Sequence, residues 1–284
     1  MMNGSEKLLL AEIEKWEQEL QKDIRTDVER TLHNWINKKM NELPVSVKQM
    51  LFSKFDECLF HLHSIIQGSY GQQDARNQIL LTAKSLGEDI YQLKDLQSLS
   101  IDQLHYLANL QTSKHRIYSL IQGGMTGTGG ILLSGVDIPA QILINLRAVQ
   151  LIAMSYGYEI NTPYEMMTSL KVFHASLMPK HLQSVAWSEL KNEIHIGAAQ
   201  DYFYEGEENL ANNYDVEFLL KQIVKLSVIA LLKKKIISGV PLISMIIGAG
   251  MNYRLTRQVT NFSNIYYQYR VIFEKNNHAG GYDE

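Results

Sequence analysis

Polar side chains interrupt the apolar helix predicted for residues 138–156, and their types and spacing could support chemistry. Asp137, Gln141 and Asn145 recur every four positions, so they form a stripe on one face of a helix. Arg147 lies on the same helix, away from that stripe. In one interpretation, Asp137 is the N-cap of the helix and Arg147 forms a structural ion pair in the core, because buried polar groups need partners.

The other interpretation is a polar site at the end of a glycine-rich segment. The candidate residues for this site are Asp137, Arg147, Tyr158, Glu159 and Arg254. In a hydrolytic site, Asp137 or Glu159 would be the base and an arginine would hold an anionic substrate. This alternative predicts a hydrolase-like or lipid-modifying enzyme. The sequence has no HExxH, paired-cysteine or GxSxG motif, so neither a metal nor a cofactor is predicted.

Two uncharged apolar segments that contain glycine, residues 117–136 and 236–253, each follow a basic cluster. The flanking residues are Lys114, His115, Arg116, Lys233, Lys234, Lys235, Arg254 and Arg257. Apolar segments with cationic flanks are typical of a wedge that sits among anionic lipid headgroups. Each segment has only seven Ile, Leu or Val residues, and its glycines and polar residues oppose insertion, so a stable membrane span is not predicted.

The glycines of these segments predict close helix packing. Gly123, Gly127 and Gly130 belong to the first segment, and Gly248 and Gly250 to the second. Small residues let helix backbones approach closely, so we predict that the two segments pack side by side as a central pair. Core packing, association with a membrane and the cradling of a ligand all remain open. A phosphate loop would need the lysine of GxxxxGK[ST], which TGTGGI lacks.

Helical periodicity extends along the rest of the chain, and no strand pattern competes with it, so we predict an all-α fold. Apolar residues recur every three or four positions between Ser5 and Asn41, which predicts one long amphipathic helix that packs on the body of the chain. The predicted organisation is an N-terminal helix at residues 1–43, one helical domain at 44–275 and a disordered tail at 276–284.

Composition narrows the classes of function. A formal net charge of −3 and a pI near 6.3 argue against a general nucleic-acid binder. The single Cys58 cannot form an internal disulfide. The N-terminus becomes charged too early for a signal peptide, so a cytoplasmic protein is expected.

Several motifs together resemble the EcsC protein family. They are the glycine-rich run at 123–130, Asp137 with Pro139, Leu146 with Arg147, Tyr156 with Gly157, and a later stretch that holds Pro241, Gly248 and Asn252. The resemblance covers residues 40–275. The family is named for a protein encoded beside the components of an ABC transporter, and the resemblance implies no catalytic residue.

The resemblance and the basic flanks predict the same kind of function. The resemblance implies a cytoplasmic accessory protein that associates peripherally with the inner face of the cell membrane. The expected partner is an anionic membrane surface or a membrane protein complex, and the expected role is to assist a transporter or a related membrane process. The oligomeric state is not predicted, and an interface through the N-terminal helix remains open.

Overall fold

The computed structural model describes residues 2–22, 44, 46, 57, 61, 64–87, 89–128, 131–178, 180–197 and 241–280. Its elements are α1 (Gly4–Gln21), α4 (Tyr70–Lys84), the 3-10 helix η1 (Leu93–Ser98), α5 (Ile101–Thr128), α6 (Ile131–Ser155), α7 (Pro163–Leu177), α8 (Lys180–Gly197) and α10 (Pro241–Gly280). No strand occurs in these ranges, and the predicted all-α fold with a single helical domain is confirmed.

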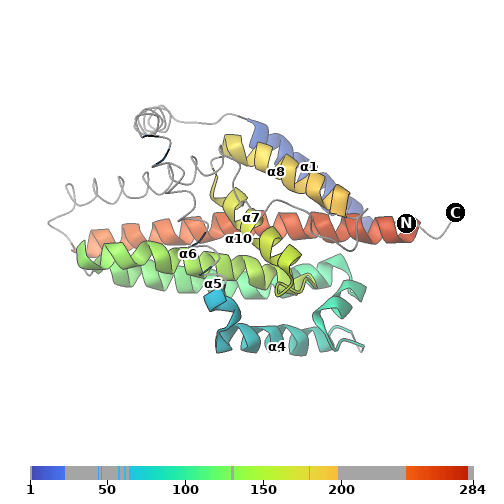
Figure 1. Ribbon diagram of the computed structural model, residues 1–284, viewed down its shortest axis with the longest axis horizontal. Coiled ribbons are helices and arrows are strands. Elements are labelled where there is room, and N and C mark those ends of the chain that lie inside the picture. Colours follow the sequence, from blue (N-terminus) through green and yellow to red (C-terminus); the bar gives the residue numbers. More distant parts are fainter. Residues whose placement is uncertain are drawn as a thin grey trace.

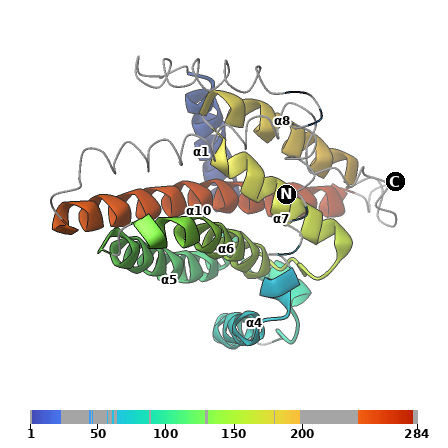
Figure 2. The ribbon, with the colours of Figure 1, turned by 60° about the vertical axis from the view of Figure 1, so that its left-hand side comes forward.

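Three long helices, α5, α6 and α10, run beside one another and form the centre of the molecule (Figure 1). Arg116 of α5 contacts Thr260, and His105, earlier in α5, contacts Gln268, so α5 and α10 are antiparallel. α6 follows α5 as an antiparallel hairpin and therefore runs parallel to α10. Figure 2 shows α1, α7 and α8 on one side of α10, with α4 on the far side of α5 and α6.

The N-terminal helix α1 packs on α8 and α10, which confirms that it lies on the body of its own chain. It begins with a capping box, in which Asn3 and Glu6 each accept a hydrogen bond from the other's backbone N–H. The helix was predicted to continue to Asn41, and this prediction is wrong. The helix ends at Gln21, because the backbone of Lys22 is extended (φ −75°, ψ 118°). Residues 23–43 lie outside the described part of the chain.

The first glycine-bearing segment folds as parts of two helices. α5 continues through Gly123 and Gly127 to Thr128, and α6 begins at Ile131. The helix predicted from residue 138 therefore starts earlier, and the prediction that Asp137 is its N-cap is wrong because this residue lies inside α6. Neighbouring helices can stabilise such a stretch against its weak helix propensity.

The second glycine-bearing segment forms the beginning of α10, with Pro241 as its first residue. Proline is tolerated there because the first N–H groups of a helix have no intrahelical partner. At its other end α10 extends to Gly280, so residues 276–280 are helical rather than disordered. Among the helices that the structure describes, none is long and apolar enough to cross a membrane.

The two segments lie at the same end of the three-helix unit, as ends of three helices rather than as an isolated pair (Figures 1 and 2). We name this end the tip and define it as residues 117–128, 131–136 and 241–253. The tip side chains are described only for Asn252 and Tyr253, so the surroundings of Gly123, Gly127, Gly248 and Gly250 are not. Cys58, Gly130, Lys233, Lys234 and Lys235 lie outside the described residues.

Gly157 ends α6 in the left-handed region, with φ at +90°. Its N–H donates to the carbonyl of Met154, and the N–H of Tyr158 donates to the carbonyl of Ala153. These two bonds form a Schellman motif, which satisfies carbonyl groups at the C-terminus of the helix. The predicted helix end is therefore confirmed, and it turns the chain so that Tyr158 enters the core.

We expect Gly157→Ala to lower the free energy of unfolding by about 1–3 kcal/mol, because φ at +90° is strained for any residue with a Cβ. The added Cβ would also lie 2.9 Å from the backbone oxygen of Leu93, which cannot move independently of η1. Urea denaturation measures the change. Gly4→Ala is the matched control, because its Cβ would meet nothing within 4 Å. Equal stability of the two variants would contradict the prediction.

Candidate functional site

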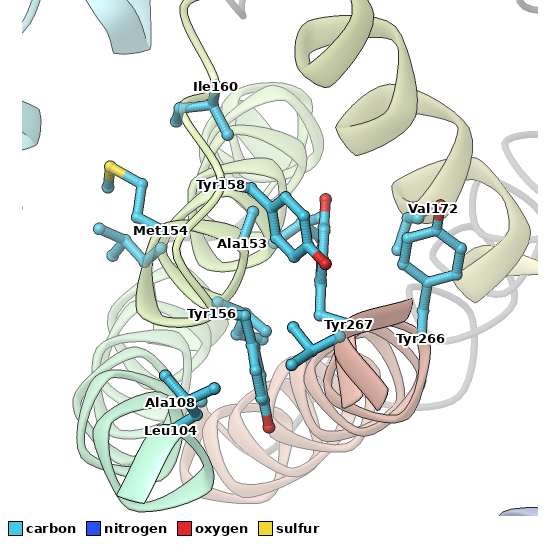
Figure 3. Close-up of a cluster of buried hydrophobic side chains, with 14 of the residues drawn as sticks. Leu104, Ala108, Ala153, Met154, Tyr156, Tyr158, Ile160, Val172, Tyr266 and Tyr267 are labelled. Carbon is cyan, nitrogen blue, oxygen red and sulfur yellow. The ribbon is translucent and has the colours of Figure 1, made fainter. Parts of the chain in front are cut away.

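The side chains described for the predicted polar site lie in separate places. Arg254 is exposed on α10. Glu159 forms an ion pair of 2.6 Å with Arg76 of α4. Tyr158 is buried and points toward α10 (Figure 3). Among the described residues, these three side chains share no hydrogen bond or ion pair. The side chain of Asp137 is outside the described part of the structure.

Arg147 has an unusual environment on α6. Its Nη2 donates to the backbone oxygen of Gly71, in the first turn of α4, at 2.8 Å. Its Nε is buried and has no hydrogen-bond partner. The predicted ion pair is not found, since no carboxylate among the described residues lies within ion-pair distance of this side chain. Within the described ranges, the hydrogen-bond acceptor of this guanidinium is the neutral backbone oxygen of Gly71.

Gln141, in the polar stripe on α6, connects this helix to α10. The Nε2 of Gln141 donates to Thr256 Oγ1 at 3.0 Å and contacts the backbone oxygen of Asn252 at 3.4 Å. Asn145 donates to the carbonyl of Gln141 at 2.7 Å. Gln141, Asn145 and Thr256 are all buried, so this part of the stripe serves helix packing rather than an open site.

A buried ionic network joins α7 to α10 and was not predicted from the sequence. Arg270 donates Nη1 and Nη2 to the two carboxylate oxygens of Glu165, at 2.8 and 2.6 Å. Its Nε donates to Glu274 at 2.7 Å, and Tyr158 OH donates to the other oxygen of Glu274 at 2.9 Å. The only local signal for this network is the i, i+4 spacing of Arg270 and Glu274.

Aromatic rings pack against the buried part of this network. The guanidinium of Arg270 lies 3.9 Å from the ring centroid of Tyr158, and Tyr266 and Tyr267 pack nearby (Figure 3). Burial acts to lower the pKa of Arg270, but Glu165, Tyr158 and Glu274 together outweigh burial and hold that pKa well above its ordinary value. Burial raises the pKa of the Tyr158 hydroxyl. With the guanidinium locked to both carboxylates, the cluster is suited to structure rather than acid–base catalysis.

His105 of α5 is the centre of a second polar cluster. Its Nδ1 lies 2.5 Å from Gln268 Nε2 and 3.2 Å from Asn264 Nδ2, and its Nε2 lies 2.8 Å from Asn109 Nδ2. Tyr156 OH donates to Asn264 at 2.6 Å. Burial lowers the pKa of His105, so the neutral ring is favoured. No carboxylate hydrogen-bonds to this imidazole among the described residues, and the contacts tie α5 to α10 through amides.

Three arginines lie where the uncharged tip begins, and we name them the basic collar: Arg116, Arg254 and Arg257. Arg116 donates to Thr260 at 3.0 Å and to Asn261 at 2.6 Å, which fixes it on α10. Burial lowers the pKa of Arg116, and the nearby positive charge of Arg257 lowers it further. Arg254 and Arg257 are exposed. The collar can therefore bind anionic groups beside the tip.

Comparison with known proteins gives one family and two relatives. The model of the EcsC protein family matches residues 7–272, which include most of α1. An uncharacterized protein, YdbA of Bacillus subtilis (strain 168), is 24% identical over 278 residues, covering 94% of this chain and 92% of YdbA. Protein EcsC of the same organism is 25% identical over 99 residues, covering 35% of this chain and 42% of EcsC. No solved structure matches the chain.

Proposed function

This chain belongs to the EcsC protein family, and we propose that it is a cytoplasmic accessory protein that binds an anionic membrane surface through its tip. In that position it would assist a transporter or a related membrane process. The observation that carries the proposal is the arrangement of charge. The arginines of the basic collar lie beside an end of the three-helix unit that has no charged residue in residues 117–136 or 241–253.

The length of the tip supports peripheral binding. α5 rises about 18 Å between Arg116 and Thr128, and α10 rises about 20 Å between Pro241 and Arg254, at 1.5 Å per residue. The hydrocarbon core of a bilayer is roughly 30 Å thick. A tip of this length can enter about one leaflet while the collar stays among the headgroups, where arginine side chains can extend to the phosphates.

Co-sedimentation with vesicles tests the proposal. We expect the protein to pellet with phosphatidylglycerol-containing vesicles at low salt, and less so as salt screens the attraction. The double variant Arg254→Glu/Arg257→Glu should bind at least about tenfold more weakly, because each basic residue near an anionic surface contributes about 1 kcal/mol. Both side chains are exposed, so the fold should be retained.

The matched control is Lys7→Glu/Lys94→Glu, which changes the net charge by the same amount. These exposed lysines lie in α1 and η1, away from the tip (Figure 1). If the control variant loses vesicle binding as much as the collar variant does, the attraction depends on total charge and the proposed surface is wrong. The proposal also fails if the unaltered protein stays in the supernatant at low salt.

A further inference from the structure

We infer that Arg147 belongs to a second site, between α4 and α6, that binds a phosphate group. This site faces α4 and does not depend on the tip or on membrane association. The observation that carries the inference is that, among the described residues, the partly buried guanidinium has no carboxylate partner and buried polar atoms on Gln67 and Gln72 have no hydrogen-bond partner.

The first observation is the missing counter-charge. Arg76 and Arg270 each reach a carboxylate, at 2.6 Å in both cases. Arg147 reaches only the backbone oxygen of Gly71, although its Nε is buried. Taking an ion out of water is unfavourable unless an opposite charge or good hydrogen bonds compensate it. An anionic ligand would supply that compensation.

The second observation is that three buried polar atoms without a partner belong to residues that are near Gly71 in the chain or in contact with it. Among the described residues, the buried side-chain atoms without a hydrogen-bond partner are Gln67 Nε2, Gln72 Oε1, Asn145 Oδ1, Arg147 Nε and Tyr267 OH. Gln72 follows Gly71 directly, Gln67 precedes it by four residues, and Arg147 contacts it. Gln72 is only 4% exposed, and its Nε2 lies 3.5 Å from Gln150 Oε1, so its amide is in the seam between α4 and α6.

Gly71 makes the approach of the guanidinium possible. A Cβ at this position would lie 2.9 Å from Arg147 Nη2 and 3.4 Å from Nη1. Gly71 is also in the first turn of a helix of 15 residues, where the helix dipole is positive. The dipole disfavours a cation at this end of α4 unless an anion lies beside it. The first turn of α4 and the guanidinium of Arg147 therefore both favour an anionic ligand.

The unpartnered atoms indicate the chemistry of the ligand. Gln67 Nε2 and Arg147 Nε are donors that need acceptors, whereas Gln72 Oε1 is an acceptor that needs a donor. A hydrogen phosphate group offers both anionic oxygens and an O–H. Arginine also binds phosphate strongly through charge-assisted hydrogen bonds. The phosphate could belong to a soluble compound or to a lipid headgroup.

Thermal unfolding in inorganic phosphate tests the site, with sodium chloride at equal ionic strength as the reference. We expect phosphate to raise Tm in a saturable manner, because a ligand that binds only the folded state stabilises it. Arg147→Gln should abolish the saturable rise. Arg76→Gln is the control, because it also removes one positive charge, but from an arginine of α4 that already pairs with Glu159. This variant should keep most of the phosphate-dependent rise of Tm. Equal responses of the two variants, or no rise beyond chloride, would overturn the inference.

A second variant keeps the test informative if Arg147→Gln fails to fold. Gly71→Ala keeps every charge but displaces the guanidinium by its Cβ. It should still fold, since alanine favours a helix over glycine and the displaced guanidinium is at the end of a flexible side chain, yet lose most of the phosphate response. If it responds to phosphate as the unaltered protein does, the inference is wrong.

Two further measurements separate this site from the basic collar and identify the source of the phosphate. Arg254→Glu/Arg257→Glu should keep the phosphate-dependent rise of Tm, and loss of the rise would assign it to the collar instead. Co-sedimentation compares vesicles that contain phosphatidic acid with vesicles that contain phosphatidylglycerol. A lipid source predicts that Arg147→Gln weakens binding to the phosphatidic acid vesicles only, and a soluble source predicts that it weakens neither.

Discussion

Arg270→Ala is expected to lower the free energy of unfolding by about 3–5 kcal/mol, as is typical when one partner of a buried ion pair is removed. The side chain of Arg270 is 6% exposed and that of Glu165 is 10% exposed. The substitution would leave the carboxylates of Glu165 and Glu274 beside each other without a cation. Urea denaturation followed by circular dichroism measures the loss.

The loss should come from uncompensated charge rather than from lost volume alone. Arg270→Met combined with Glu165→Gln and Glu274→Gln keeps most of the volume and removes all three charges. We expect this triple variant to recover much of the stability, because apolar or neutral replacements of a complete buried ion network are often tolerated. If the triple variant is less stable than Arg270→Ala, the network contributes through packing and its charges are not the cause.

A more exposed ion pair supplies the control for this series. Lys171 of α7 and Glu193 of α8 lie 2.7 Å apart, with side chains 24% and 41% exposed. Water competes for such a pair, so Lys171→Ala should change stability by at most about 1 kcal/mol. A loss similar to that of Arg270→Ala would mean that burial does not distinguish the two pairs and would contradict the prediction.

Local signals in the sequence predicted several helix ends correctly. Ser100 and Gln103 form the predicted capping box, with bonds of 2.9 and 3.3 Å. Thr162 accepts from the N–H of Glu165 as the predicted N-cap of α7. These signals work because each depends on residues three positions apart, so a helix end can be recognised without knowing what the helix packs against.

Interactions between distant residues could not be predicted in this way. Glu165 and Arg270 are 105 positions apart, and periodicity shows only that each lies on a helix. The ion pair expected for Arg147 was wrong for the same reason, because no sequence pattern indicated that Gly71 would bring a backbone oxygen to its guanidinium. The start of α6 was misplaced because intrinsic propensity is a weak guide when neighbouring helices can stabilise a glycine-rich stretch.

Trp187→Ala is expected to lower the free energy of unfolding by about 3–5 kcal/mol, the usual range for truncation of a large buried aromatic side chain. Trp187 of α8 is 3% exposed. Its ring meets that of Trp16 at 5.0 Å and that of Phe262 at 5.9 Å between centroids, both edge to face. Its Nε1 also donates to Glu17 at 2.6 Å, so the substitution removes a partly buried hydrogen bond as well.

This substitution also tests whether α1 belongs to the cooperative fold. Trp187 joins α1 to α10, and the family match includes residues of both helices. If α1 unfolds with the rest, Trp187→Ala should shift one urea transition measured by both circular dichroism and tryptophan fluorescence. Val185→Ala, on the same helix at a side chain that is 56% exposed, should stay within about 0.5 kcal/mol of the unaltered protein. Two separate transitions in the Trp187 variant would instead mean that α1 is an independent arm.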